Sequence, residues 1–408
     1  MWKTLVDRLL QTVIQHGDLT VTYPDGTKTK YGDGTGAARA FAIKDDATLR
    51  ALCLTPELGL GEAYMDARVI VENDDLDGLM ALLVDNRRTN AMPFWNRISD
   101  MYHYVTRDIH LRNTTFSARQ NVSHHYDISD KLYALFLDAD MQYSCAYFTE
   151  PDMSLEDAQV AKKRHIARKL QIEPGMTVLD IGCGWGGMAL TLARDFGARV
   201  TGVTLSKNQL ATAQRRAEEA GLSDRIEFKL LDYRKVDGPF DRVVSVGMLE
   251  HVGVPHYAEY FSKVADVMGS DGVALIHTIG RSAPPTRQSA WINKYIFPGG
   301  YVPSLSELAR PIEDAQLWQL DLEVWRLHYA YTLRHWRDRF EANLETVRKD
   351  YDERFVRMWR YYLTVCIMAF EVQPQAVFQF QLGHKRDVVP ITRDYLYGSQ
   401  SAQSRAAE

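Results

Sequence analysis

A glycine-rich turn at residues 178–187 constrains the fold of this chain more than any other feature. The segment reads VLDIGCGWGG, so an apolar strand ends beside an acid, and a turn with four glycines leads into a helical pattern near Met188. Glycine is needed where the backbone turns sharply or approaches a ligand without a clashing Cβ. In open α/β sheets such a turn lies at the carboxyl end of a strand, where ligands bind. The turn alone also fits a dinucleotide site or a purely structural role.

The rest of the sequence supports an α/β fold with a second, smaller domain. From about residue 123 onward, apolar strands alternate with helical patterns, which predicts a parallel sheet covered on both faces. We expect an N-terminal α+β domain at 1–110, a polar linker at 111–122, a catalytic domain at 123–398 and a disordered tail at 399–408. Expected strands of the catalytic domain are 177–181, 199–203, 226–230, 240–246, 273–278 and 376–382, the last preceded by a long helix at 353–370.

Composition and charge exclude several classes of protein. The net charge of −5 gives no reason to expect nucleic acid as the main partner. No run of about 18 apolar residues occurs, so we expect no transmembrane helix, and the N-terminus lacks the apolar core of a signal peptide. The scattered cysteines predict neither a disulfide framework nor a zinc cluster, which suits a reducing cytoplasm; they are Cys53, Cys145, Cys183 and Cys366.

Two segments have both a simple structural interpretation and a membrane interpretation. The basic run at 162–169 is typical of a solvated helix face, although it also fits contact with an anionic membrane. The first helix, which begins near Trp2, is amphipathic, and packing against its own domain is the simpler prediction.

The glycine-rich turn resembles that of class I S-adenosylmethionine-dependent methyltransferases, because Asp180 begins the pattern DxGCGxG. These folds usually carry an acid at the end of the second strand, about 20 residues on, which binds the ribose hydroxyls. Here the segment 203–206 reads VTLS and contains no acid. Other polar groups must therefore replace that carboxylate.

Several further motifs, in order, resemble the cyclopropane-fatty-acid synthase family, which includes the mycolic acid cyclopropane synthases. The resemblance covers about residues 120–390. It implies a class I methyltransferase fold, an N-terminal lipid-binding domain and S-adenosylmethionine as cofactor. The motifs are YSCAYF at 143–148, GCGWGG at 182–187, TLSKNQ at 204–209, EHVG at 250–253, HTIG at 277–280 and HYAYTL at 328–333.

The resemblance also assigns cofactor-binding positions. Gln209 is our candidate for the ribose hydroxyls, in place of the missing acid. The full set is Tyr143, Ser144, Asp180, Gly182, Cys183, Gly184, Gly186, Thr204, Leu205, Gln209, Asp232 and Tyr233.

A bound bicarbonate ion is the second cofactor that the resemblance implies. Attack of an acyl-chain double bond on the sulfonium methyl group gives a carbocation, and ring closure then requires the methyl group to lose a proton. A small, held base suits an apolar pocket. Glu250 would accept a hydrogen bond from the ion, while His277 and Tyr329 would orient it. The implied ligands are Cys145, Glu250, His277, the backbone of Ile279, and Tyr329.

The same residues have simpler interpretations when they are considered alone. A histidine within an apolar strand, as at His277, is often a hydrogen-bonded core residue, and Cys145 fits a small buried hydrophobe. Cys366 matches a cysteine that has been regarded as a catalytic nucleophile, but transfer from a sulfonium to an alkene needs no thiolate. We expect a tunnel or core residue there. The aromatic candidates for stabilising a cation are Tyr126, Tyr143, Tyr147, Trp185 and Tyr301.

The sequence thus predicts an enzyme that forms cyclopropane rings in the unsaturated acyl chains of phospholipids. Its location would be the cytoplasm, at the surface of the inner membrane, and the resemblance allows a homodimer. Three alternatives stay open. These are carbon methylation of acyl groups without ring closure, which gives methyl-branched or methylated unsaturated products, a lipid-binding protein without catalysis, and a methyltransferase for small soluble substrates.

Overall fold

The computed structural model describes residues 1–89 and 130–397, which form two compact units. The first unit combines 1–89 with 286–298 and 333–374, and the second combines 130–285 with 299–332 and 375–397. The expected catalytic domain at 123–398 contains two segments, 286–298 and 333–374, whose contacts lie mainly in the first unit. The expected linker at 111–122 and tail at 399–408 lie outside the described residues.

The first unit is built on a four-stranded sheet in the order β2-β1-β3-β4. Strands β1 and β2 form an antiparallel hairpin, and the Gly26 N–H donates to the Tyr23 carbonyl at 2.9 Å in its turn. The expected first helix is also present. Its elements from residues 1–89 are α1 (Trp2–Val13), β1 (Asp18–Thr22), β2 (Lys28–Tyr31), β3 (Ala38–Ile43), α2 (Asp46–Leu54), α3 (Pro56–Met65), β4 (Val69–Val71) and α4 (Leu76–Thr89).

Later segments of the sequence also belong to this unit. The long helix α16 packs against α3 and α4, and α12 packs against α3. Gly61 in α3 lets the Trp291 ring approach, since a Cβ there would stand 2.3 Å from that ring. Thr364 donates to Asp77 at 2.8 Å. The later elements are α12 (Ala290–Tyr295), α15 (Leu344–Asp350), α16 (Glu353–Glu371) and most of α14 (His328–Ala342).

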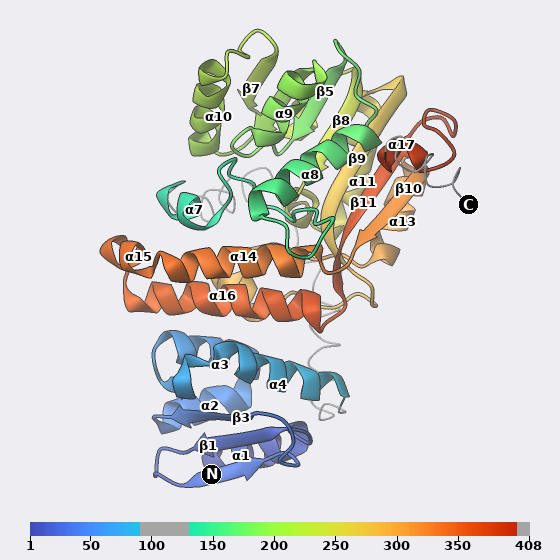
Figure 1. Ribbon diagram of the computed structural model, residues 1–408. Helices are drawn as coiled ribbons and strands as arrows, with labels where there is room; N and C mark the ends of the chain where they lie inside the picture. Colours follow the sequence, from blue (N-terminus) through green and yellow to red (C-terminus); the bar gives the residue numbers. More distant parts are fainter. Residues whose placement is uncertain (90–129, 398–408) are drawn as a thin grey trace, which may run out of the picture. The chain divides into compact units, whose positions relative to one another are not determined.

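The second unit is a seven-stranded α/β sheet in the order β10-β11-β9-β8-β5-β6-β7 (Figure 1). Strands β9, β8, β5, β6 and β7 are parallel, as the sequence predicted. Strand β11 is antiparallel to its neighbour β9, and β10 is antiparallel to β11. The strands are β5 (Thr177–Ile181), β6 (Arg199–Thr204), β7 (Ile226–Leu230), β8 (Phe240–Val246), β9 (Met268–Arg281), β10 (Trp318–Trp325) and β11 (Gln375–Gly383).

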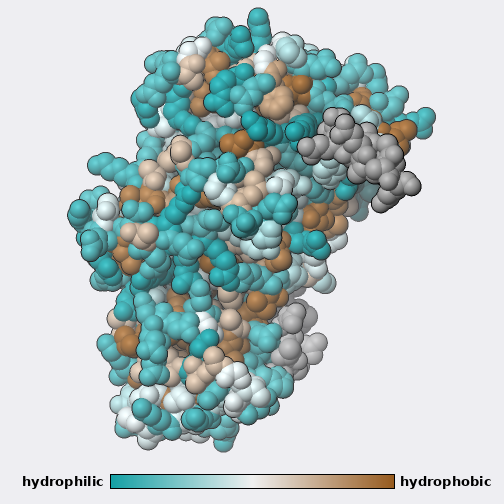
Figure 2. All heavy atoms as spheres, in the orientation of Figure 1, coloured by the Kyte–Doolittle hydropathy of each residue, from teal (hydrophilic) through white to brown (hydrophobic). Residues whose placement is uncertain are grey.

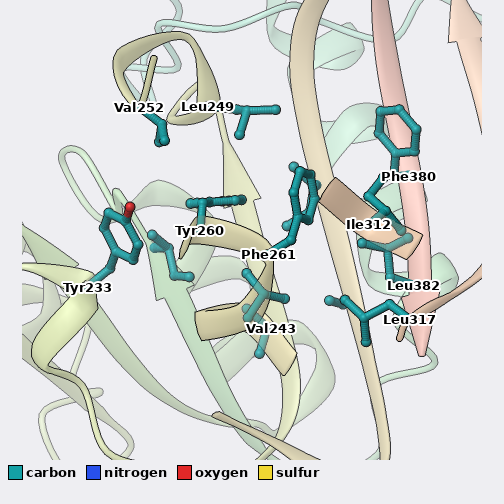
Figure 3. Packing of buried hydrophobic residues seen from close by; sticks show 14 of the residues in the cluster. Tyr233, Val243, Leu249, Val252, Tyr260, Phe261, Ile312, Leu317, Phe380 and Leu382 are labelled. Carbon is teal, nitrogen blue, oxygen red and sulfur yellow. The ribbon is translucent and has the colours of Figure 1, made fainter. Parts of the chain in front are cut away.

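Helices cover both faces of this sheet, which explains why its central strands are apolar almost throughout. Helices α8, α9 and α10 supply the core of one face, and α11 and α13 supply the other (Figures 1 and 3). Tyr233, Leu249 and Val252, which follow strands β7 and β8, belong to the second core, so the loops at this edge are fixed by packing. The helices are α7 (Asp130–Phe136), α8 (Leu155–Lys169), α9 (Gly187–Phe196), α10 (Lys207–Glu219), α11 (Tyr257–Val267), α13 (Leu305–Asp314) and α17 (Asp394–Tyr397).

Among the helices in the described part of the protein, none is long and apolar enough to cross a membrane. The face shown in Figure 2 is covered mainly by hydrophilic side chains with smaller apolar areas between them.

Candidate active site

One pocket opens at the carboxyl ends of β5, β6, β7 and β8. Strand β5 has β8 on one side and β6 on the other, so the strand order reverses at this point, where open α/β sheets bind ligands. All the cofactor residues expected from the sequence line this pocket except Gly186. Those present are Tyr143, Ser144, Asp180, Gly182, Cys183, Gly184, Thr204, Leu205, Gln209, Asp232 and Tyr233.

The glycines of this edge have different structural roles. Gly184 and Gly247 have φ of 54° and 68°, and no atom lies within 4 Å of where a Cβ would stand, so both leave open space in the pocket. Gly186 has φ of 83°, but a Cβ there would lie 2.7 Å from the Phe228 ring. Gly186 is therefore required for packing of the helix against β7, which explains its absence from the lining.

Asp180 presents a buried, uncompensated carboxyl group to the pocket. Its Oδ2 has no hydrogen-bond partner among the described residues, and the side chain is 2% exposed. Burial raises the pKa of Asp180 to about 7. Because an unpaired buried charge is costly, this carboxyl group suits a positively charged ligand group such as the ammonium of S-adenosylmethionine.

Gln209 occupies the place expected of the ribose-binding group. The Thr204 hydroxyl donates to Gln209 Oε1 at 2.9 Å, and Ser206 caps helix α10 by accepting from the Gln209 N–H at 3.2 Å. The amide is thereby oriented with Nε2 left to donate to a ligand. This geometry supports the prediction that Gln209 replaces the missing acid.

Asp232 forms a charged wall of the pocket together with Arg234. The guanidinium donates from Nε at 2.9 Å and from a terminal nitrogen at 2.7 Å, one bond to each carboxylate oxygen. Burial opposes ionisation of Asp232, but the bonds from Arg234 prevail and lower its pKa. Asp232 is thus held as an anion beside the pocket.

Glu250 and Ile279 are brought together as the sequence predicted. Glu250 follows β8, and its Oε1 accepts from the Ile279 N–H of β9 at 2.5 Å. Its other oxygen, Oε2, is buried without a partner in the described part of the protein. Burial raises the pKa of Glu250 to about 7. This carboxyl group therefore has one oxygen fixed and one available to accept a hydrogen bond.

His277 lies two residues before Ile279 on the same strand, and its ring is fixed in a defined state. The Gln379 amide of β11 donates to His277 Nδ1 at 3.0 Å, so a neutral ring carries its proton on Nε2. The ring is 3% exposed, and burial lowers its pKa well below the usual value. His277 is therefore a neutral hydrogen-bond donor, which suits an anion.

Cys145 and Tyr329 belong to a second group of buried residues. The Ala146 N–H donates to the Thr332 hydroxyl at 3.0 Å, which ties the YSCAYF segment to the first turn of α14, where Tyr329 lies. Cys145 is 1% exposed, and burial strongly raises its thiol pKa. The thiol is therefore not a nucleophile near neutral pH, and any role in binding falls to its backbone or to the neutral sulfur.

Trp325 joins these two groups. Its indole lies edge-on to the His277 ring at 5.1 Å and contacts Tyr147 at 4.8 Å and His328 at 5.4 Å. Tyr147 and His328 belong to the same segments as Cys145 and Tyr329, so Trp325 connects His277 with these two segments. Cys145, Glu250, His277 and Tyr329 do not line the pocket described above.

Cys366 belongs to the other compact unit, in helix α16. Its burial raises the thiol pKa to about 12, so almost no thiolate exists at neutral pH. This environment favours the expected core or tunnel role over the nucleophilic one.

The aromatic candidates have different surroundings. Tyr143 and Trp185 line the pocket, while the Tyr147 ring stacks on His165 at 4.5 Å. The Tyr301 hydroxyl donates to Glu307, and its N–H donates to the Glu250 carbonyl at 2.9 Å. Tyr126 lies outside the described residues.

The structure also reveals site residues that the sequence interpretation missed. Lys162 was expected on a solvated helix face, yet it is fully buried. Three other residues of the same basic run are buried too, namely Lys163, His165 and Lys169. A signal was present, because Lys162 falls on the same helical stripe as Leu155 and Ile166. Other pocket residues without a sequence prediction include Gln142, Gly247, Met248 and His251.

Comparison with known proteins identifies relatives of this site. Residues 113–380 match the family model described as mycolic acid cyclopropane synthetase, and residues 5–92 match a domain of unknown function (DUF7884). A cyclopropane-fatty-acyl-phospholipid synthase from Escherichia coli K12 is 39% identical over 345 residues, 84% of this chain and 88% of the relative. A probable fatty acid methyltransferase from Pseudomonas putida is 42% identical over 289 residues, 68% and 73% of the two sequences.

Solved structures agree with this relationship. A mycolic acid cyclopropane synthase complexed with SAH and CTAB has a TM-score of 0.61 at 34% identity, covering 65% of this chain and 97% of that one. Coclaurine N-methyltransferase, at 21% identity and a TM-score of 0.65 over 79% of this chain and 98% of that one, shares the fold. The class I methyltransferase fold expected from the glycine-rich turn is thereby confirmed.

Proposed function

Because this chain belongs to the mycolic acid cyclopropane synthetase family and is an S-adenosylmethionine-dependent methyltransferase, we propose that it builds a cyclopropane ring across the cis double bond of phospholipid acyl groups, with bicarbonate as the base. The observation that carries the proposal is the buried Oε2 of Glu250, which has no partner among the described residues, while the other oxygen of the same carboxyl group is bonded to Ile279, two residues along the strand from His277. An acceptor such as this oxygen and a neutral donor such as His277 fit an ion that has both a hydroxyl group and anionic oxygens.

The pocket at the strand ends holds S-adenosylmethionine in this proposal. Its sulfonium supplies an electrophilic methyl group. Asp180 receives the ammonium of the amino-acid portion, and Gln209 Nε2 donates to a ribose hydroxyl. Gly184 and Gly247 leave the space that the ligand fills.

The bicarbonate site would use the residues named from the sequence. Bicarbonate supplies a base small enough to work where side chains leave little room. Glu250 accepts its hydroxyl proton in a hydrogen bond, and His277 donates to an oxygen. Tyr329 and the Cys145 segment close the other side, and Trp325 excludes water. Fixing both partners of a proton transfer before reaction lowers the barrier, since little reorganisation remains.

The lipid substrate and the location form a further part of the proposal. The name of the Escherichia coli relative specifies fatty-acyl-phospholipid, and we extend that class of substrate to this protein. We also propose a lipid-binding role for the N-terminal domain and action in the cytoplasm at the inner membrane surface, as a homodimer.

Carbon methylation of acyl groups without ring closure is the second candidate. It is favoured by the names of two relatives, the probable fatty acid methyltransferase of Pseudomonas putida and a tuberculostearic acid methyltransferase of Mycobacterium tuberculosis. The latter is 34% identical over 394 residues, 93% of this chain and 90% of the relative. Both reactions share the transfer of the methyl group and the resulting carbocation, and they differ only in the steps that follow.

The purified protein, vesicles of a cis-unsaturated phospholipid and S-adenosylmethionine test the proposal. We expect turnover to fall strongly in buffer freed of carbon dioxide and to recover when bicarbonate is added. Turnover that is independent of bicarbonate would contradict its role as base. Activity on short soluble acceptors and none on vesicles would contradict the lipid substrate.

A further inference from the structure

Lys162 is a buried cation that the proposed mechanism does not use. It lies on the inner face of α8 with a relative exposure of 0%. Transfer of an ammonium group into a protein interior is costly unless polar partners surround it. Among the described residues, no carboxylate lies within ion-pair distance of Lys162, whereas Lys163 and Lys169 on the same helix are both paired with acids.

The two acceptors of Lys162 are neutral, and both line the cofactor pocket. Its Nζ donates to Ser144 Oγ at 2.7 Å and to Gln142 Oε1 at 2.8 Å. The other end of the Gln142 amide donates to Asp140 at 3.0 Å. Gln159 fixes the backbone of the same segment by donating to the Ser144 carbonyl at 3.0 Å. Lys162 thus supports one wall of the pocket from behind.

The hydrogen bond from Lys162 determines whether the Ser144 hydroxyl donates or accepts toward the pocket. A hydroxyl group has one hydrogen to donate, and Ser144 Oγ accepts from an ammonium that can only donate. The structure records no protein acceptor for the Ser144 hydrogen within the described residues. The hydroxyl is therefore set to donate into the pocket, with a positive charge 2.7 Å behind it.

A ligand group that matches this wall is an acceptor with negative charge. S-adenosylmethionine carries one such group, the carboxylate of its amino-acid portion. We propose that Lys162 is a positioning residue that makes Ser144 the donor to this carboxylate and supplies the charge that complements it. The inference rests on the proposed cofactor pocket.

The rest of the pocket is consistent with this assignment. Asp180 offers an unpartnered acid for the ammonium of the same amino-acid portion. Ser144 with Lys162 and Asp180 together form a pair of opposite charges that fits a zwitterion. Burial lowers the pKa of Lys162 to about 7, and the neighbouring Asp138 offsets only part of that effect, so an anionic ligand would stabilise its charged form.

Two ligands that differ only in the amino-acid portion test the inference. S-adenosylhomocysteine retains that portion, and 5′-methylthioadenosine lacks it. In Lys162→Met, titration calorimetry on the full-length protein should show about 10- to 100-fold weaker binding of S-adenosylhomocysteine, the range of one charge-assisted hydrogen bond. Binding of 5′-methylthioadenosine should stay within about twofold of the wild type.

Lys169→Met is the matched control, because it removes another buried lysine from the same helix that pairs with Glu323. It should leave the ratio of the two affinities unchanged. Equal losses for both ligands in Lys162→Met, or no loss for either, would overturn the inference. If the wild type binds 5′-methylthioadenosine but not S-adenosylhomocysteine, the inference alone fails; if it binds neither, the proposed cofactor pocket fails as well.

Ser144→Ala keeps the test decisive if Lys162→Met does not fold. It should show the same selective loss of S-adenosylhomocysteine binding. Where both variants fold, the double variant should lose no more than about twofold beyond the larger single effect, because the two residues act through one bond. Additive losses, or unchanged binding in Ser144→Ala, would contradict the proposed coupling.

Discussion

At the scale of single residues, the site depends on two buried carboxyl groups with incomplete hydrogen bonding. Glu250 has one oxygen bonded to the Ile279 N–H and the other without a partner in the described part of the protein, and Asp180 has an unpartnered Oδ2 there as well. An incompletely paired buried acid destabilises the protein alone and is compensated when a ligand arrives. Each group therefore gives a separate prediction.

Replacing Glu250 by glutamine tests its catalytic role. The amide keeps the size and the Ile279 contact but weakens acceptance of a proton. We expect kcat to fall about 10²- to 10⁴-fold, the usual range for an acid–base group, with S-adenosylhomocysteine binding unchanged. Added bicarbonate should restore only part of the rate. Glu313→Gln, at an exposed carboxylate, is the control, and equal activity in both variants would rule out the assigned role of Glu250.

Asp180→Asn tests how much the buried Asp180 carboxyl group destabilises the folded protein, through the pH dependence of the unfolding free energy. The folded-state pKa of about 7 exceeds the usual 3.8, so the contribution of Asp180 to the stability of the wild type is greatest below about pH 4 and is lost as the pH rises to about 7. In the protein without ligand, the variant should gain on the order of 3–4 kcal/mol over wild type at pH 8, and little at pH 4.

Urea denaturation at the two pH values measures this difference in unfolding free energy. A gain that does not change with pH would mean that Asp180 is not the buried, titrating group. The same variant should bind S-adenosylhomocysteine more weakly, because its ammonium loses its partner.

At the scale of helices and strands, helix α16 contains Cys366, whose role as a possible nucleophile can be tested. Its thiol has a pKa of about 12, and methyl transfer from a sulfonium to an alkene needs no thiolate. We expect Cys366→Ser to retain kcat within about threefold, since the substitution of one small, half-buried side chain costs mainly stability. Cys53→Ser in the same compact unit is the control. A folded but inactive Cys366→Ser protein would restore the nucleophile hypothesis.

Features with a local cause were predictable at this scale, and features set by distant contacts were not. The turn after β5 needs glycines wherever it occurs, so the pocket was recognisable from residues 178–187. Strand β10 was missed because its antiparallel pairing with β11 joins residues about 60 positions apart in the sequence. The basic run of α8 was predicted to be exposed because of its charge. The helical spacing that places Lys162 on the same face as Leu155 and Ile166 indicated burial instead.

At the scale of the whole molecule, the compact units do not follow the order of the sequence. Helix α16 and α12 complete the unit that contains the first 89 residues. The family models that match residues 5–92 and 113–380 do not reveal this arrangement, because each model follows a continuous segment. The domains expected from the sequence are continuous segments as well.

A fragment that lacks residues 1–107 tests whether the later helices depend on the N-terminal residues of their compact unit. It should expose buried side chains of α16 that contact the deleted residues, such as Tyr361 and Thr364, and should aggregate or be digested rapidly. Limited proteolysis and thermal unfolding, with the full-length protein as control, measure this. A fragment that unfolds cooperatively near the Tm of the full-length protein would contradict the described packing.

The central claim is that the site forms a ring rather than a branch. The most direct measurement uses S-adenosylmethionine with a trideuterated methyl group, followed by mass spectrometry and NMR of the acyl groups. Ring closure removes one hydrogen from the methyl carbon, so we predict a product with two deuterium atoms in a cyclopropane ring and no double bond at that position. A product that keeps all three deuterium atoms in a methyl group would contradict the account.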